Sequence, residues 1–194
     1  MAKEKKSKKE HKTSNTKPPT IKGMFVNSHI NALKKAKGEK SLTLLEEKCG
    51  FHPQFGALED VPVRLEIEII EHVLDILTND SLPKNQRAFE AGRLHFNNFQ
   101  NTVYGRLILN FLSKDFKSAM LNSPNIAIYV FKHIEFSVFD RGEKSVMLRM
   151  ENNDYNIDHF RGFFFEWLKD WGYDAEVEGI DYGNGTYEYV MKWK

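Results

Sequence analysis

Cysteine is almost absent from the sequence, which contains only Cys49. No disulfide can form within the chain, and such scarcity is typical of proteins in reducing compartments, so we expect a cytoplasmic protein. Long apolar runs are also absent, since no stretch reaches the roughly 18 consecutive apolar residues of a membrane-spanning helix. No apolar segment follows the charged N-terminus, so we expect neither a secretory signal nor a transmembrane segment.

The sequence also lacks the common motifs of catalysis and metal binding. Gly-x-Ser-x-Gly does not occur, and no glycine-rich loop leads into a helix that could hold a phosphate. No two of the seven histidines lie within four residues of each other, so no single helix can present a histidine pair to a metal. We therefore expect no enzyme, no catalytic residues, no metal site and no cofactor.

Charge is distributed unevenly along the chain. The net charge is +1, but residues 1–17 hold seven lysines and only two glutamates. We expect residues 1–20 to be a disordered lysine-rich tail, because they bring almost no apolar surface to bury. Such a tail either contacts an anionic membrane surface or nucleic acid, or serves as a solubilising leader. No aromatic residue stands among the lysines to stack on bases, so we expect nucleic-acid contact only through the charge of the tail.

Aromatic residues are abundant: they make up 13% of the chain, with fifteen phenylalanines, as in a globular domain with a large core. Apolar residues recur at helical spacing over residues 21–38, 41–50, 63–77, 84–100, 104–121 and 157–171. They alternate as in strands over residues 127–131, 133–140, 144–150, 174–181 and 186–193. Residues 63–77 fit both patterns, but they are long for a strand, and on the favoured helix Glu66, Glu68 and Glu71 should project into solvent.

This order of elements predicts an α+β fold. We expect residues 21–194 to form a single ligand-binding-like domain. In it, an N-terminal helical layer packs on a mainly antiparallel sheet of about four strands, with one late helix between the two hairpins. Gly92 should allow close approach of a neighbouring element. Phe163, Phe164 and Phe165 are consecutive on the late helix, so that helix must contact two surfaces.

Three stretches of the chain resemble a known family. They are Ile21-Lys22-Gly23-Met24-Phe25-Val26, then Ala91-Gly92-Arg93 through Phe96, Phe99 and Thr102 to Gly105-Arg106, and Phe160-Arg161-Gly162 before a strand pair that ends at Trp193. Over residues 21–194 the chain resembles an uncharacterised family described mainly from myxobacteria. That family is similar to haem nitric-oxide/oxygen-binding domains, vinyl-reductase-like domains and TRAPP vesicle-tethering subunits. The resemblance implies a ligand pocket or lipid-like channel between helices and sheet.

The resemblance does not extend to haem binding. Haem-binding members are similar in having an axial histidine on the helix before the sheet and a Tyr-x-Ser-x-Arg run that holds the propionates. Residues 104–121 contain no histidine, and no tyrosine begins such a run. His95 or His133 could replace the axial ligand only in a rearranged site, so we expect no haem.

Our leading hypothesis is a non-enzymatic sensor or binding module that holds a small apolar, amphipathic or lipid-like ligand between helices and sheet. We expect the pocket walls to be Phe96, Phe99, Tyr104, Phe163 and Trp167. Three arginines either anchor an acidic head group or form structural ion pairs: Arg93, Arg106 and Arg161. The alternatives are a TRAPP-like adaptor, as a homodimer or with a protein partner, and contact with anionic surfaces or nucleic acid through the basic tail.

Overall fold

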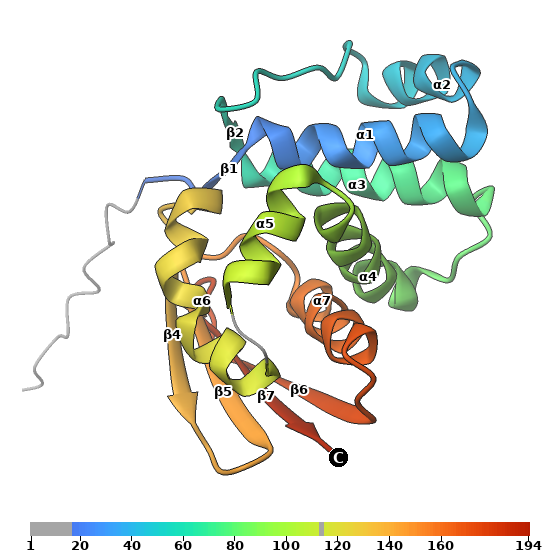
Figure 1. Ribbon diagram of the computed structural model, residues 1–194. Helices are drawn as coiled ribbons and strands as arrows, with labels where there is room; N and C mark the ends of the chain where they lie inside the picture. The colour runs from blue at the N-terminus through green and yellow to red at the C-terminus, as the bar shows by residue number, and fades with distance from the viewer. Residues whose placement is uncertain (1–16, 113–114) are drawn as a thin grey trace, which may run out of the picture.

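The computed structural model describes residues 17–112 and 115–194 and has the expected α+β fold (Figure 1). The elements follow in the order β1 (Thr20–Lys22), α1 (Gly23–Lys37), α2 (Lys40–Cys49), β2 (Asp60–Pro62), α3 (Val63–Thr78), the short 3₁₀ helix η1 (Lys84–Gln86), α4 (Arg87–Gln100), α5 (Val103–Leu112), α6 (Phe116–Val130), β3 (Phe131–Lys132), β4 (Glu135–Asp140), β5 (Ser145–Glu151), α7 (Ile157–Asp170), β6 (Ala175–Asp181) and β7 (Tyr187–Trp193).

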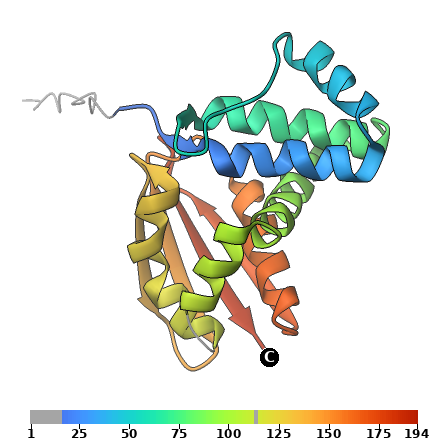
Figure 2. The ribbon, with the colours of Figure 1, turned by 45° about the horizontal axis from the view of Figure 1, so that its top comes forward.

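The N-terminal helices α1, α2 and α3 form a layer at one end of the molecule, with α1 and α3 side by side (Figure 2). Lysines lie in the last turn of α1, where their positive charges interact favourably with the negative end of the helix dipole. Gly38, with φ 79°, follows the last residue of the helix. Residues 63–77 are helical, as length and the apolar stripe predicted, because Val63, Ile70 and Val73 are all buried on α3.

The fold includes residues that precede Ile21, where the expected domain begins. Pro19 is buried and its carbonyl accepts a hydrogen bond from the backbone N–H of Val63 at 3.0 Å. Thr20 pairs with β2 and β3, so that β1 is the centre of a small antiparallel sheet of order β2-β1-β3. This sheet was not predicted, because strands of two or three residues are too short to show alternation. The tail prediction otherwise concerns residues 1–16, which lie outside the described residues.

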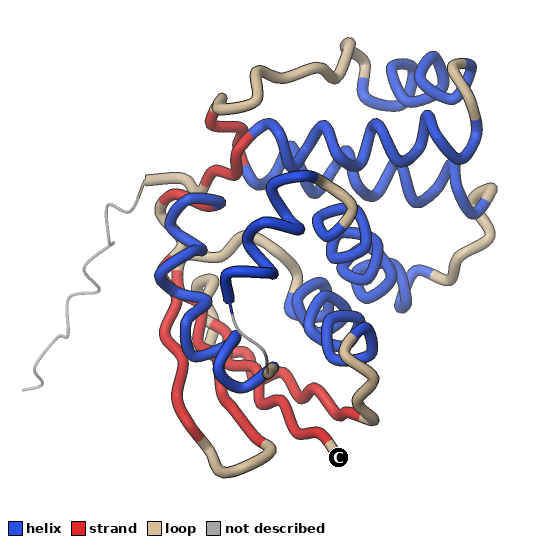
Figure 3. Tube along the Cα trace, in the orientation of Figure 1, coloured by secondary structure: helices blue, strands red, loops and turns tan. Residues whose placement is uncertain are grey.

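The larger sheet has the order β4-β5-β7-β6 and is antiparallel throughout (Figure 3). It confirms the two predicted hairpins and the sheet of about four strands. In the central pair, Leu148 lies opposite Tyr189 and Val146 lies opposite Met191, and all four side chains are buried. Helices α6 and α7 cover this sheet (Figure 1).

Helix α7 lies between the sheet and α4, so its consecutive aromatic residues contact two surfaces, as expected. Phe164 packs against Tyr189 of the sheet, with ring centroids 5.5 Å apart. Phe163 points to the other side and meets Phe96 of α4 at 5.3 Å. The predicted close approach at Gly92 is confirmed, because a Cβ there would stand 1.7 Å from the backbone oxygen of His159.

Two predictions for the middle of the chain are wrong. Residues 104–121 are not one helix, since α5 ends at Leu112 and α6 begins at Phe116. Residues 127–130 are not a strand but the last turn of α6, and only Phe131 belongs to β3. Helix α6 continues through Pro124. Proline has no N–H to donate to the Met120 carbonyl four residues earlier, and the Ser123 hydroxyl donates to that carbonyl instead, at 2.8 Å. Among the described helices, none is both long and apolar enough to cross a membrane.

Candidate functional site

An apolar cavity of about 80 Å³ lies between α4, α5, α6, α7 and the larger sheet. The side chains around it are apolar apart from His95 and Ser123. They are His95, Phe99, Ile108, Leu109, Ser123, Ile126, Ala127, Val130, Phe131, Phe136, Leu148, Phe160, Phe163, Phe164 and Trp167. The cavity is where the resemblance placed a pocket, between helices and sheet.

Phe163 forms the part of the wall nearest to His95. Its ring stands edge-on to the His95 ring, with centroids 5.4 Å apart and an interplanar angle of 85°. It also meets Phe99 at 6.4 Å and Trp167 at 6.3 Å, and both of these line the cavity as well. The T-shaped contacts fix the orientation of the Phe163 ring. The cavity is therefore bounded by aromatic rings, and the polar side chain of His95 lines it beside Phe163.

Behind this wall lies a cluster of four buried titratable side chains from four helices. His29 belongs to α1, Glu66 to α3, His95 to α4 and His159 to α7, and none of them is more than 2% exposed. Each occupies a position on the apolar stripe of its helix, as His29 does between Phe25 and Leu33 at four-residue spacing. The amphipathic pattern that buries one face of each helix thus also buries an ionisable group on each of the four helices.

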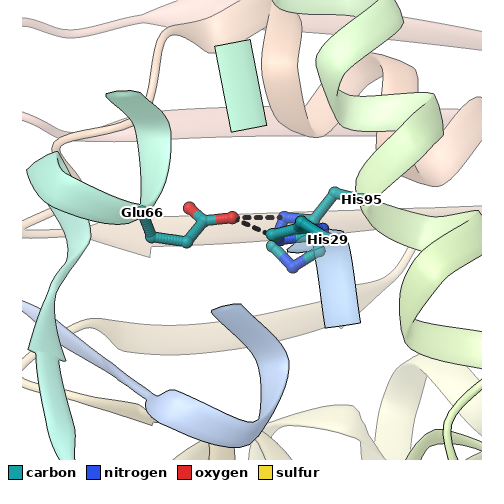
Figure 4. Close-up of side chains that lie close together, drawn as sticks. All are labelled: His29, Glu66 and His95. Carbon is teal, nitrogen blue, oxygen red and sulfur yellow. Dashed lines mark hydrogen bonds and ion pairs between the residues drawn. The ribbon is translucent and has the colours of Figure 1, made fainter. Parts of the chain in front are cut away.

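Hydrogen bonds connect the cluster (Figure 4). His29 Nε2 lies 2.8 Å from Glu66 Oε1, and the Asn98 amide nitrogen lies 3.0 Å from His29 Nδ1. An amide nitrogen donates, so Nδ1 of His29 accepts, and His29 Nε2 carries the proton that is donated to Glu66. His95 Nδ1 lies 3.7 Å from the same carboxylate oxygen and 3.0 Å from His159 Nε2.

The Glu66 carboxyl is the ionised group at the centre of this cluster near neutral pH. Burial opposes ionisation of Glu66, but the neighbouring His95 and His29 outweigh burial and lower the pKa of this carboxyl to about 2. Burial also disfavours the charged form of the histidines: it lowers the pKa of His95 to about 3 and that of His159 to about 4, against the attraction of the carboxylate. Glu66 is therefore ionised while His95 and His159 are neutral.

Two polar atoms of the cluster have no hydrogen-bond partner among the described residues. They are Glu66 Oε2 and the hydroxyl of Tyr155, and both are buried. The Tyr155 ring lies against the His159 ring at 4.6 Å. Burial, and then the Glu66 carboxylate, raise the pKa of the Tyr155 hydroxyl well above its ordinary value. Unpaired buried polar atoms are rare in folded proteins. The Tyr155 hydroxyl and the Glu66 carboxylate lie near enough to pair with each other.

The aromatic residues expected as pocket walls fall in three places. Phe99, Phe163 and Trp167 line the cavity. Phe96 is fully buried and packs behind Phe163 and Trp167 without lining the cavity. Tyr104 lies on α5 and is 53% exposed. The structure thus brings three of the five together around one space.

The three arginines expected near the pocket do not line the cavity. Arg93 donates to Glu166 at 2.6 Å and also pairs with Glu90. Arg161 pairs with Asp158 at 2.6 Å, and the exposed Arg106 donates to the Asn101 carbonyl at 3.1 Å. Each arginine therefore has partners within the protein, as in the alternative that these arginines are structural. Binding of an acidic head group by these residues stays a prediction.

One expectation about Glu66 is wrong, because this residue is fully buried and does not project from the solvated face of its helix. The spacing of histidines along the sequence did not predict this cluster, because spacing can only reveal histidine pairs on a single helix. Here His29, Glu66 and His95 come from three helices, yet one ligand atom of each lies within 4.8 Å of the others. The available signal was a polar residue on an apolar stripe, as at His29 between Phe25 and Leu33.

Solved structures similar to this chain include H-NOX domains. One is described as an oxygen-binding H-NOX domain related to soluble guanylate cyclases. It is 16% identical, with a TM-score of 0.66 over 90% of this chain and 95% of that chain. Another is a mutant of an Fe(II) unliganded H-NOX protein from K. algicida, 10% identical, with a TM-score of 0.59 over 90% of this chain and 97% of that chain. These identities show the fold alone, so this chain is a protein with an H-NOX-like fold.

Within that class, the chain belongs to the family described as protein of unknown function (DUF2378), whose model matches residues 15–194. No curated protein matches the chain. The expected uncharacterised family and the likeness to haem nitric-oxide/oxygen-binding domains are confirmed. The likeness to vinyl-reductase-like domains and TRAPP subunits stays a prediction.

Proposed function

We propose that this protein is a non-catalytic sensor or binding module whose cavity holds a small apolar molecule. The observation that carries the proposal is the cavity itself, which is lined by aromatic and aliphatic side chains together with His95 and Ser123. Apolar spaces of this kind stay dry and take apolar guests. The H-NOX-like fold supports the proposal as an analogy, since an oxygen complex of one such domain has the same fold.

The size of the cavity limits the ligand. A cavity of roughly 150 Å³ binds one benzene molecule, and this one measures about 80 Å³. Its guest therefore has only a few heavy atoms, unless α5 and α6 move apart. No lysine or arginine lines the cavity, so the proposal favours an apolar guest over an amphipathic one with an acidic head group.

The cavity does not fit haem. A space smaller than that for one benzene cannot hold four linked pyrrole rings. Its single nitrogen donor, His95, already shares a hydrogen bond with His159 at 3.0 Å, and no basic side chain lines the cavity to hold propionates. The proposed ligand therefore binds without haem.

A guest in the cavity would contact α5 and α6, which supply Ile108, Leu109, Ser123, Ile126, Ala127 and Val130 to its wall. These helices also carry much of the exposed apolar surface of the described chain. A ligand that changes how they pack therefore changes the surface offered to a partner, and this coupling is what a sensor needs.

Binding of xenon under pressure to the full-length protein, followed by NMR, tests the proposal, because xenon is an apolar guest with a single heavy atom. We expect saturable shifts of methyl groups at Ile108, Leu109 and Ile126, and their loss in Ala127→Leu, which fills the cavity. Ala36→Leu places the same side chain on the exposed surface of α1 and should bind as the wild type does. Equal binding in both variants, or none in the wild type at saturation, would rule out the cavity as the binding site.

A second candidate function is self-association through α5. Val103, Leu107 and Phe111 form a stripe at four-residue spacing, are 71%, 51% and 77% exposed, and lie beside the exposed Tyr104. Exposed apolar stripes of this kind mark contacts with other proteins. A homodimer through this face is the adaptor alternative in its simplest form.

A further inference from the structure

We propose that His29, Glu66 and His95 form a binding site for one divalent first-row transition metal ion, such as Zn²⁺ or Fe²⁺. The three side chains approach one another from α1, α3 and α4, and Figure 4 shows both rings directed at the same carboxylate. The inference rests on the donor atoms and their surroundings. It stands whether or not the cavity takes an apolar ligand.

The spacing of the donor atoms suits a small metal ion. Two ligand atoms that each lie about 2.1 Å from a tetrahedral ion are about 3.4 Å apart. Here Glu66 Oε1 is 2.8 Å from His29 Nε2 and 3.7 Å from His95 Nδ1, so the observed separations lie on either side of that value. The ligand atoms of the third pair, His29 and His95, lie within 4.8 Å of each other, so an ion can enter once the imidazole rings shift toward it, and the helices already hold the donors together.

The kinds of donor select the class of metal. Two imidazoles and one carboxylate form the protein ligand set of many catalytic zinc sites and of non-haem iron(II) sites. Calcium and magnesium prefer oxygen donors, which this set provides only through one carboxylate. The set contains no thiolate, so it does not favour copper(I) or iron–sulfur clusters.

The electrostatics of the cluster point to a missing cation. Among the described residues, the ion pairs of Glu66 are only with His29 and His95, and no lysine or arginine contacts it. A buried carboxylate without a permanent positive partner is unfavourable. Its second oxygen, Oε2, is left for the Tyr155 hydroxyl, which lies near enough to pair with this carboxylate. A divalent cation on Oε1 would compensate the charge.

Neighbouring residues can support the bound state. When Nε2 of His29 binds a metal, its proton moves to Nδ1, and rotation of the Asn98 amide then presents an oxygen to accept it. His159 Nε2 lies 3.0 Å from His95 Nδ1, and it loses this partner when His95 binds the metal. It is the nearest further nitrogen for a fourth coordination position.

Metal titration of the full-length protein after chelator treatment tests the site. We expect one equivalent of Zn²⁺ or Co²⁺ to bind, with intense visible bands of Co²⁺ that indicate four coordination. Glu66→Gln and His29→Gln should weaken binding by about 100-fold or more, since even residues behind the ligands change affinity by roughly 10–100-fold. Glu46→Gln and His52→Gln remove the same groups from an exposed His–Glu pair and should leave affinity unchanged.

A second measurement keeps the test decisive if the buried variants fail to fold. In wild-type protein labelled with ¹⁵N at histidine, Zn²⁺ should shift the ring nitrogens of His29 and His95 and leave those of His52 and His72 in place. If no equivalent binds after chelation, or if only the exposed rings respond, the cluster is a hydrogen-bonded network of protons and not a metal site.

Discussion

Gly92 of α4 lies directly against the backbone carbonyl of His159 on α7, where a Cβ would stand 1.7 Å from the oxygen. The contact is reciprocal, because a Cβ at Gly162 of α7 would stand 1.9 Å from the carbonyl oxygen of Phe89 on α4. Two glycines thus let α4 and α7 approach closely. This approach brings His95 to His159 and places Phe163 beside the cavity.

Gly92→Ala should therefore destabilise the protein by about 3 kcal/mol, because the backbone carbonyl cannot move away without separating the helices. Urea denaturation measures the change. Gly56→Ala is the control, since a Cβ there meets only the Glu59 side chain at 3.6 Å, and its effect should stay within about 0.5 kcal/mol. Equal stabilities of the two variants would contradict the role of Gly92 in the helix contact.

The metal-free protein should lose stability in acid. The pKa values of His95 and His159 are lowered from 6.5 to about 3 and about 4, and that of Glu66 from 4.5 to about 2. At a pH between the ordinary pKa of each group and its lowered pKa in the folded protein, the unfolded chain binds more protons than the folded one. The free energy of unfolding is therefore at its full value above about pH 6.5 and falls as the pH decreases.

In the range from pH 6 to pH 4.5 the two histidines dominate this loss. Each contributes a slope of about 1.4 kcal/mol per pH unit. Urea denaturation at several pH values in the presence of a chelator measures it. His159→Gln removes one of the two histidines that take up a proton on unfolding, so it should about halve the slope of unfolding free energy against pH, whatever its effect on stability at neutral pH. An unchanged slope would mean that His159 is not neutral in the folded protein.

Phe163→Ala should cost about 3 kcal/mol or more of unfolding free energy, because the ring packs on His95, Phe96 and Trp167 and its removal enlarges the cavity. Phe111→Ala is the matched control: its ring is 77% exposed, so the expected change is within about 0.5 kcal/mol. Thermal or urea unfolding of both variants checks the difference, and a similar loss in both would contradict the position of Phe163 in the core.

Self-association through α5 should depend on Leu107 and Phe111, which are exposed at four-residue spacing. Sedimentation velocity of the wild type at increasing concentration should show a concentration-dependent dimer, and Leu107→Ser with Phe111→Ser should abolish it. Ser replaces both side chains where solvent already reaches them, so folding should persist. A wild type that remains a monomer at the highest concentration excludes the adaptor alternative in its homodimeric form.

Local pattern determined most of the secondary structure. Fifteen residues at helical spacing predicted α3, and alternation around Gly183-Asn184-Gly185 predicted the hairpin of β6 and β7, because both periods depend on neighbours in sequence. The alternation of apolar residues at 127–130 wrongly predicted a strand, because helix α6, capped by Asp115, continues through Pro124 to Val130. An apolar run of only four residues is too short to distinguish the period of a helix from that of a strand.

The sequence by itself determined which face of each element is apolar, that two hairpins form one sheet, and that Gly92 allows a close contact. Only the tertiary structure decided what those faces meet. Glu66 is buried because His29 and His95 reach it from other helices, and the cavity exists because α5 and α6 cover α7 and the sheet. Periodicity reports burial within one element, whereas a polar side chain or an empty space in the core depends on partners that are remote in sequence.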